Sequence, residues 1–402
     1  MRRSMAVMPL AASLCLVLGC SGAGGMPEGD PAVSIAGVAL AQRGAGDPRH
    51  GSYVKRNLVS DGALPAEHTD PNLLNAWGLD ALPTTPWWVA DNGQGVSTLY
   101  DAQGIAQPQS PMPLVVAIPG ASGPAAPSGL VANPTAEFII TLGGTTAPAR
   151  FLFASEDGTI AAWTRTDPLS PSALKVVDAS DRAAVFKGLA LATGPRGSRL
   201  FATDFHNGII RAYDGTFAEV TLPRGAFKDE RIRAGFAPFG IRVIDGIVLV
   251  TYAMQDAAGH DDVKGPGFGF VDAYQTDGRL IARIASRGKL NSPWGLALAP
   301  ARFGPDSRRL LVGNFGDGHI LSFGLHRDDG RDRGEKEDDL DDDGEYLATA
   351  DGPVVIDGLW ALSFGNGSLA GPTNTLFFTS GPNGEADGLF GRIDFAPGMS
   401  QR

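Results

Sequence analysis

The chain has 402 residues, a formal net charge of -11 and a hydrophobic fraction of 43%. A chain of this length and apolar content buries a large core and is not disordered, and its 54 glycines and 29 prolines favour many turns over a helical bundle. The acidic balance argues against a nucleic-acid partner, and two cysteines are too few for a disulfide framework.

The first 19 residues have the composition of an export signal. Arg2 and Arg3 precede an apolar run from Met5 to Leu18, and the small residue Gly19 stands directly before Cys20. This order is typical of a signal peptide, and a cysteine at the cleavage point resembles the lipobox of bacterial lipoproteins. We therefore expect residues 1–19 to be a signal peptide and Cys20 to carry lipid chains that anchor the protein without spanning the membrane.

The segment that follows is expected to be a tether. Residues 20–51 are rich in Gly, Ala and Pro without a sustained pattern, which is typical of a flexible linker. Ser21 after the cysteine resembles outer-membrane sorting if the cell is Gram-negative. The expected location is the cell envelope, with the lipid anchor as the only membrane contact, because no later stretch is apolar over 18 residues. The alternative is an ordinary secretory signal and a secreted protein.

From residue 52 to residue 398 one pattern returns six times. A Gly-Leu or Gly-Ile pair precedes an apolar strand, then a turn with Asp or Asn and Gly, then a strand that ends near an aromatic residue. The recurring glycines, 51 to 63 residues apart, are Gly78, Gly129, Gly188, Gly240, Gly295 and Gly358. Each interval has room for four short strands, the size of a propeller blade. The sequence therefore predicts an all-β fold, a six-bladed β-propeller. A pair of β-sandwiches, the alternative, would not repeat one pattern six times.

Two further structural expectations concern the ends of this repeat array and its largest insertion. The segment Tyr53–Leu58 is expected to pair with the last blade and close the ring. Residues 326–346 form an acidic insert between blades five and six.

Three motifs extend this prediction to a family. They are Asn291 to Pro300 (NSPWGLALAP), Leu310 to Gly318 (LLVGNFGDG) and Asp357 to Leu362 (DGLWAL). With weaker matches over residues 53–396, they resemble a family of exported bacterial proteins described as conserved hypothetical proteins with an NHL-like propeller. The resemblance implies the fold and the export, and it carries over no catalytic residues.

Acidic and amide side chains in the blade loops are the candidate functional residues. Those expected to bind at the channel mouth are Asn75, Asp91, Asn92, Asn314, Asp317 and Asp357, and the candidates for catalysis are His206, Glu156 and Asp204. Six-bladed calcium-dependent lactonases use such rings. Oxygen ligands suit Ca²⁺, which would polarise an ester carbonyl while a carboxylate or His moves protons. The alternative is that these side chains hydrogen-bond their own turns.

The acidic insert is a second candidate calcium site. Asp339, Asp341 and Asp343, followed by Gly344, match the opening of an EF-hand-like loop. The closing Glu is absent, because Ala350 stands at the twelfth position. The alternative is a solvated charged loop.

Three tryptophans lie next to a repeat glycine or within its motif: Trp77, Trp294 and Trp360. We expect them to pack near the propeller axis, where bulky rings fill space. A stacking platform for a sugar or peptide is the alternative.

Two functions follow. The first is a monomeric binding or scaffold module, not an enzyme, whose partner is an envelope protein, a glycan or a small molecule. The alternative is a calcium-dependent lactonase or esterase-like hydrolase with its site at the propeller axis. A hydrolase of the α/β class is excluded because no Gly-x-Ser-x-Gly nucleophile elbow is present.

Overall fold

The computed structural model describes residues 38–39, 52–109, 112–194, 197–324, 326–327 and 344–397. The signal segment, Cys20 and the candidate calcium ligands Asp339, Asp341 and Asp343 lie outside the described residues. Within these ranges, no helix has the length and apolar run that a membrane crossing requires.

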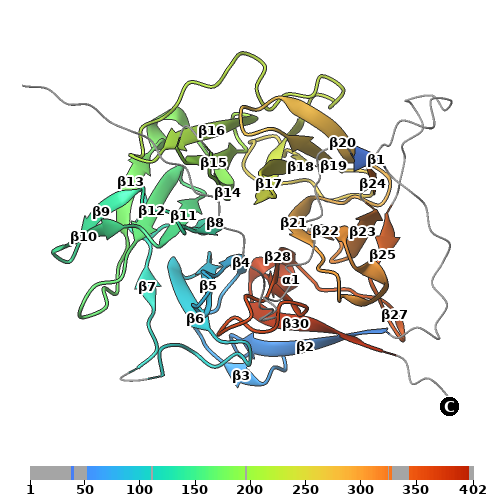
Figure 1. The fold of residues 1–402 in the computed structure, drawn as a ribbon, viewed down its shortest axis with the longest axis horizontal. Helices are drawn as coiled ribbons and strands as arrows, with labels where there is room; N and C mark the ends of the chain where they lie inside the picture. Colours follow the sequence, from blue (N-terminus) through green and yellow to red (C-terminus); the bar gives the residue numbers. More distant parts are fainter. Residues whose placement is uncertain are drawn as a thin grey trace, which may run out of the picture. The chain divides into compact units, whose positions relative to one another are not determined.

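The described strands gather into six larger sheets around one axis, as the six repeats predict (Figure 1). The first three blades are β4 (Ala76–Asp80), β5 (Trp87–Asp91), β6 (Val96–Tyr100) and β7 (Val116–Ala117); β8 (Pro127–Ala132), β11 (Phe151–Ser155), β12 (Thr159–Trp163) and β13 (Leu174–Asp178); and β14 (Phe186–Ala192), β15 (Arg199–Asp204) and β16 (Ile209–Asp214). The next two are β17 (Phe236–Ile244), β18 (Ile247–Met254), β19 (Gly269–Tyr274) and β20 (Leu280–Ser286); and β21 (Pro293–Leu298), β22 (Arg309–Asn314), β23 (Ile320–Gly324) and β25 (Glu345–Tyr346). The sixth is β28 (Leu359–Phe364), β29 (Leu376–Ser380), β30 (Leu389–Ala396), β2 (Ser52–Ser60) and β3 (His68–Thr69).

Shorter elements decorate the blades. Three two-stranded pairs join β9 (Ile139–Leu142) to β10 (Thr145–Pro148), β1 (Val38–Ala39) to β24 (His326–Arg327), and β26 (Ala348–Thr349) to β27 (Gly352–Pro353). The helical segments are single turns: α1 (Pro382–Glu385) and the 3₁₀ turns Ser180–Arg182 and Gly304–Asp306. The acidic insert therefore begins and ends in short strands, β24 and β25.

The repeat glycine marks a bulge in the inner strand of blades one to five. The pairing register between the inner strand and its neighbour shifts at this point in all six blades. Glycine is required where blades approach closely: a Cβ on Gly240 would lie 2.2 Å from the carbonyl oxygen of Trp294, and one on Gly129 would lie 2.4 Å from the Leu189 nitrogen. The bulge turns the preceding side chain toward the axis.

One expectation about this pattern is wrong. In blade six, Leu359 pairs with Ser380 and Leu362 with Phe378, in the same register as Ala76 with Asp91 and Leu79 with Val89 in blade one. The residue equivalent to the repeat glycine is therefore Ala361, and Gly358 lies in the preceding turn. A methyl group fits at this junction, and the nearby glycine in the DGLWAL motif is a turn residue with φ of 62°.

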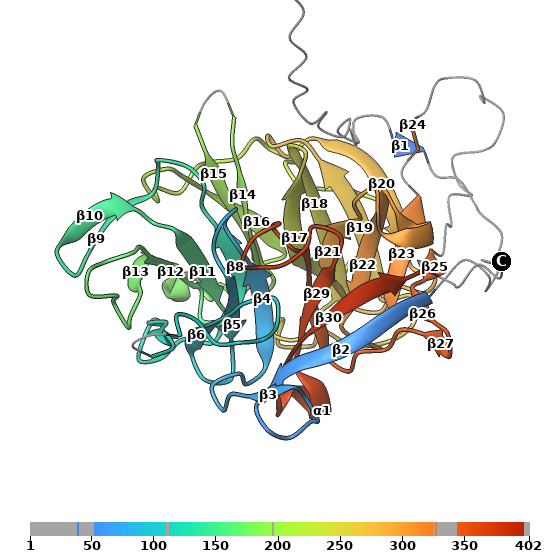
Figure 2. The ribbon, with the colours of Figure 1, turned by 60° about the horizontal axis from the view of Figure 1, so that its bottom comes forward.

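The ring closes as predicted. Strand β2 pairs antiparallel with β30, from Ser52 opposite Ala396 to Ser60 opposite Leu389, and the two run side by side in Figure 2. Strands β2 and β3, from the start of the propeller, thus complete the sixth blade on the outer side of β30. This pairing closes the ring.

Buried apolar side chains form one cluster between each pair of neighbouring blades. Between blades one and two, for example, Trp88 stacks on Phe151 with ring centroids 4.2 Å apart. A seventh cluster lies on the axis and is built from aromatic rings of several blades. The core is therefore circular, and each blade packs on two others.

Candidate functional site

Aromatic rings fill the axis at the level of the inner-strand bulges. Trp77 of blade one stacks on Trp360 of blade six with ring centroids 3.6 Å apart, and Phe315 stacks on the same Trp360 at 3.8 Å. Trp294 meets both tryptophans edge-on, at 6.2 and 5.8 Å. The prediction that these three tryptophans pack near the axis is confirmed. Their packing forms a rigid floor for the polar side chains above it.

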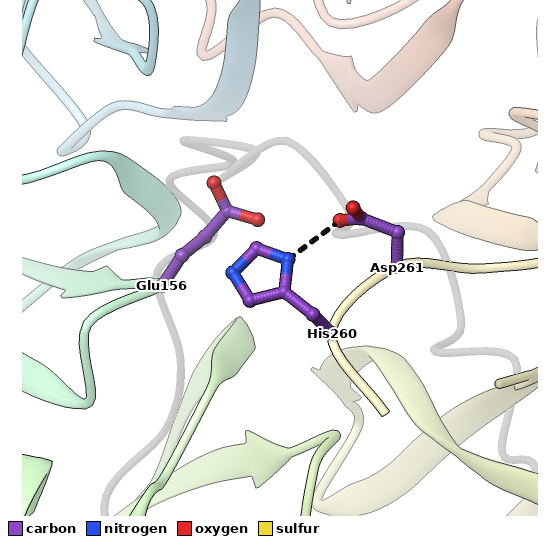
Figure 3. Close-up of side chains that lie close together, drawn as sticks. All are labelled: Glu156, His260 and Asp261. Carbon is purple, nitrogen blue, oxygen red and sulfur yellow. Dashed lines mark hydrogen bonds and ion pairs between the residues drawn. The ribbon is translucent and has the colours of Figure 1, made fainter. Parts of the chain in front are cut away.

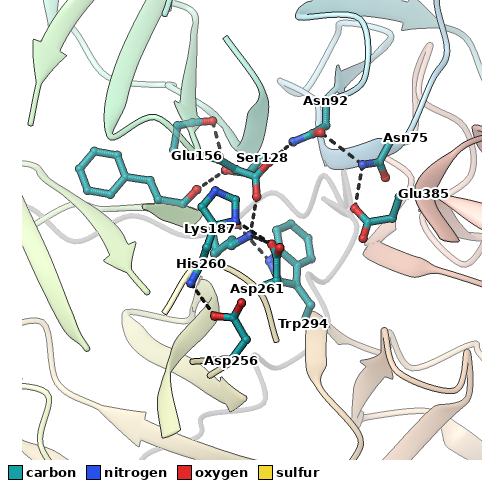
Figure 4. A network of polar contacts seen from close by, with 12 residues as sticks. Asn75, Asn92, Ser128, Glu156, Lys187, Asp256, His260, Asp261, Trp294 and Glu385 are labelled. Atoms are coloured by element: carbon teal, nitrogen blue, oxygen red, sulfur yellow. Dashed lines mark hydrogen bonds and ion pairs between the residues drawn. The ribbon is translucent and has the colours of Figure 1, made fainter. Parts of the chain in front are cut away.

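Lys187 lies on this floor and is the least expected residue of the site. It occupies the bulge position of blade three, its side chain is 2% exposed, and its Nζ lies 5.2 Å from the centroid of the Trp77 ring. The ammonium donates to Glu156 Oε1 and, over 3.2 Å, to Asp261 Oδ1 (Figure 4). Burial alone would lower the pKa of Lys187, but the two carboxylates outweigh it and raise the pKa, so the lysine is charged at neutral pH.

Amide side chains extend the network across blades one and six. Asn92 Nδ2 donates to Glu156 Oε2 over 2.9 Å, and Asn75 Nδ2 donates to Asn92 Oδ1 over 3.2 Å and to Glu385 Oε2 over 2.8 Å. Burial, and then the charge of Glu156, raise the pKa of Glu385 above its ordinary value. The amides therefore connect two carboxylates that would otherwise repel each other at close range.

The solvent side of the network comes from the long loop between β18 and β19. His260 Nδ1 lies 2.9 Å from Asp261 Oδ1, and both residues are exposed. Burial would raise the pKa of Asp261, but the nearby Lys187 charge prevails and lowers it. We call the whole network the axial mouth; its members are Asn75, Asn92, Glu156, Lys187, His260, Asp261 and Glu385.

Three members of the axial mouth form the group closest to a metal site in the described part of the chain. One potential ligand atom each from Glu156, His260 and Asp261 lies within 4.8 Å of the others (Figure 3). This group does not fit Ca²⁺, which takes six to eight oxygen ligands, since one of its three donors is a nitrogen. Both carboxylates also hold the Lys187 ammonium, which carries the positive charge that a cation would supply there.

Three of the predicted site residues lie inside the blades instead. Asp91, Asp204 and Asn314 each end the second strand of a blade and are fully buried. Asp204 accepts from Arg211 Nε over 2.8 Å, and Asn314 Oδ1 accepts from the Asn291 backbone over 3.2 Å. Asp204, which also accepts from the Asn207 backbone, and Asn314 stabilise the blade turns, as the alternative interpretation expected. Asp91 does not, because neither of its carboxylate oxygens has a hydrogen-bond partner among the described residues.

Three other predicted residues lie nearer the surface but do not join the network. Asp317 accepts from the backbone of His319 over 3.2 Å, and the exposed Asp357 accepts from the backbone of Asn383 over 2.8 Å. His206 is exposed, with Nδ1 3.1 Å from the Ala258 carbonyl oxygen. Of the predicted set, the structure brings together Asn75, Asn92 and Glu156.

The sequence did not predict the other four members of the axial mouth: Lys187, His260, Asp261 and Glu385. The signal for Lys187 was available, because five blades carry Trp, Ser or Phe at the bulge position and only blade three carries a charge there. For Asp261, in an irregular loop, and Glu385, at the end of the single turn α1, no local signal exists, since each contacts its partners only across the ring.

Beyond the aromatic floor, the inner strands enclose a cavity of about 350 Å³. Apolar side chains line most of it, and Asp80 and Arg242 are its charged residues. Asp80 accepts from the Ala132 backbone over 2.8 Å, and Arg242 donates to the Leu362 carbonyl over 2.9 Å. Burial raises the pKa of Asp80, against the opposing effect of Arg242.

Fold and site together define a six-bladed β-propeller whose axis is filled by aromatic rings and capped by a buried lysine. No protein-family model matches the chain. It is 30% identical over 345 residues to "Uncharacterized protein R648" of Acanthamoeba polyphaga mimivirus, covering 84% of this chain and 78% of the relative. It is 28% identical over 349 residues to "Uncharacterized protein L690" of the same virus, covering 84% of each. The chain belongs to the family of the mimivirus protein R648.

These relatives are viral, so the bacterial and exported character that the motifs implied stays a prediction. Among solved structures, the chain is similar to one titled "Streptogramin B lyase structure", with a TM-score of 0.48 and 11% identity over 86% of this chain and 98% of the other. The propeller assignment rests on the strand pairing of the chain itself.

Proposed function

We propose that the chain is a binding module that recognises its ligand with the axial mouth. The observation that supports this function is the place of Lys187, whose ammonium already neutralises the carboxylates that a metal-dependent hydrolase would need for its cation. The ammonium is held between Glu156, Asp261 and the aromatic floor. It fixes the two carboxylates in place, so they are preorganised to accept hydrogen bonds from a ligand rather than to activate water.

The charge of the axial mouth indicates the ligand class. The axial mouth holds three carboxylates and one bonded ammonium, that of Lys187, which pairs with Glu156 and Asp261. Glu385 has only the uncharged amide of Asn75 as a side-chain partner. Lys264 lies close by but packs over the Phe315 ring, 3.9 Å from its centroid. We therefore expect a ligand with amino or guanidinium groups, on a peptide, an envelope protein or a small molecule.

The proposal includes the location of the module. A lipid-modified Cys20 and a tether over residues 20–51 would hold the propeller at the cell envelope while leaving its faces free to bind. The proposed form is a monomer, which leaves the axial mouth accessible.

A calcium-dependent lactonase or esterase is the second candidate. Its support is the approach of Glu156, His260 and Asp261 to within 4.8 Å. Against it stand the small number of oxygen donors and the competing ammonium.

Calorimetric titration of the full chain tests both functions. We expect tetralysine to bind, tetraglutamate not to bind, and CaCl₂ to give no saturable heat. Because the pairing is electrostatic, Asp261→Asn with Glu385→Gln should weaken tetralysine binding about tenfold. The matched control is Asp245→Asn with Glu230→Gln, an equal charge change at exposed residues away from the mouth.

Two outcomes would count against the binding module. Micromolar calcium binding that Glu156→Gln abolishes would favour the hydrolase and justify a screen of lactones and esters. Equal binding of tetralysine and tetraglutamate would contradict recognition by acidic groups.

A further inference from the structure

A second cavity, of about 680 Å³, lies between blades one and two, away from the axial mouth. Its lining includes Trp88, Phe151 and Trp163 from the facing blades. It also includes Arg150, just before β11, and Arg165, just after β12. Cavities that bind small molecules have volumes of roughly 300–1,000 Å³ and are lined by apolar and aromatic side chains with a few polar groups. This cavity fits that description in both size and lining.

The aromatic wall of the cavity is held in a fixed arrangement. The Trp88 ring stacks on Phe151 at 4.2 Å and lies 4.8 Å from Trp163. The Trp163 indole nitrogen donates to the Ser170 carbonyl oxygen over 2.9 Å, which fixes the orientation of the ring. A ligand that packs here would not have to order these side chains, and this lowers the entropic cost of binding.

Side-chain hydrogen bonds to the backbone fix the loops around the rest of the cavity. Asn366 Nδ2 donates to the carbonyl oxygens of Leu82 and Thr85, over 2.7 and 2.9 Å, and so fixes the loop beside the cavity. Thr164 Oγ1 donates to the Pro148 carbonyl oxygen over 2.8 Å and ties the end of β12 to the end of β10. The cavity is thus largely preformed.

Its charge is the opposite of the chain's. The charged residues among its lining are Arg150 and Arg165, on a chain of net charge -11. Both are exposed, and neither guanidinium has a hydrogen-bonding or ion-pair partner among the described residues. A guanidinium presents its donors in a planar fork that matches a carboxylate or sulfonate.

We propose that this cavity binds an amphipathic organic anion. The aromatic or aliphatic body of the ligand packs against the apolar lining, in which Leu114 and Leu369 are accessible. The almost fully buried rings of Trp88, Phe151 and Trp163 form the wall behind them. The carboxylate or sulfonate is bound by Arg150 and Arg165. The site is separate from the axial mouth and recognises the opposite charge. A negative result for this site therefore does not affect the proposed function, and the reverse also holds.

The test compares two probes of the same shape, 1-naphthoate and the uncharged 1-naphthamide. Binding to the full chain is followed by quenching of tryptophan fluorescence and by calorimetry, at low and high salt. We expect one naphthoate per chain, an affinity at least about tenfold above that of naphthamide, and weaker binding as salt rises.

Variants locate the binding. Arg150→Gln with Arg165→Gln should weaken naphthoate binding about tenfold or more and leave naphthamide unchanged. Ala147→Phe, which places a ring in the cavity, should weaken both probes. The control is Arg233→Gln with Arg302→Gln, two exposed arginines outside the cavity, and circular dichroism verifies that each variant is folded.

The proposal is wrong if naphthoate shows no saturable binding at millimolar concentration. It is equally wrong if the two arginine pairs have the same effect, or if Ala147→Phe leaves both affinities unchanged.

Discussion

Replacing Lys187 with methionine is expected to lower the free energy of unfolding by about 3–5 kcal/mol at pH 7. Methionine keeps most of the apolar stem above Trp77, so the loss comes from the charge. Glu156, whose side chain is 14% exposed, would keep its negative charge without a bonded cation. Urea unfolding, followed by tryptophan fluorescence, measures the change.

Two controls separate charge from packing. Adding Glu156→Gln to Lys187→Met should recover most of the loss, because no unpaired carboxylate remains. Lys175→Met removes a lysine that is paired with Asp178 on the surface, so it should change the free energy of unfolding by less than about 1 kcal/mol. A double variant as unstable as Lys187→Met would mean that packing, not the ion pair, dominates.

Asp204→Asn and Asp91→Asn are expected to have opposite effects on stability. The two residues are equivalent, since each ends the second strand of its blade and pairs with the first residue of the inner strand. Both are fully buried. Asp204 has the Arg211 guanidinium and Asn207 as partners. Asp204→Asn should cost about 3 kcal/mol, because the Arg211 Nε–H loses its buried carboxylate and the arginine keeps only Glu219 as an ion-pair partner.

Asp91 has no such partner. Neither of its carboxylate oxygens has a hydrogen-bond partner in the described structure, and burial raises its pKa well above the ordinary range. Asp91→Asn replaces a group whose charge is costly to bury, so it should leave stability unchanged or raise it by about 1–3 kcal/mol at neutral pH.

The pH dependence gives the sign of this effect independently. Because the folded state holds the Asp91 proton more tightly, its contribution to stability is fully present below the unfolded pKa of about 4. That contribution is lost as pH rises toward the folded pKa. The difference in free energy of unfolding between Asp91→Asn and wild type should therefore grow with pH. Asp272, whose pKa burial raises to about 6, affects the pH dependence of both proteins equally and cancels from this difference. A difference that stays constant from pH 4 to 8 would contradict a raised Asp91 pKa.

The blades could be predicted from sequence because their determinants are local. The glycine at the bulge, the apolar strand after it and turns such as Asp157-Gly158 act over a few residues, and each copy repeats them. The one error of register, at Gly358, arose where Ala361 takes the bulge position and a turn glycine lies three residues earlier. Spacing alone does not distinguish two glycines that serve different backbone needs.

The axial mouth could be predicted only in part, because its contacts cross the ring. Asn92 and Glu156 directly follow the second strands of their blades, and Asn75 directly precedes an inner strand, so all three lie at the same end of the propeller. Asp91 and Asp204 satisfy the same pattern but end buried strands, and the pattern does not reveal which way a side chain faces at a strand end. Lys187 departs from the apolar or small residues at this position in the other blades. Its role could not be predicted locally, because its partners Glu156 and Asp261 lie 31 and 74 residues away.

The strand pair β2–β30 also constrains how the protein reaches its folded state. Ser52 and Ala396 pair across nearly the whole propeller sequence, so this contact is among the most distant along the chain. The entropy of closing a loop grows only with the logarithm of its length, so this distant seam costs little more at equilibrium than a short one. Its cost is kinetic, because contacts between distant segments slow folding. Until β2 reaches β30, the outer edge of blade six presents unpaired backbone groups that another chain could bind.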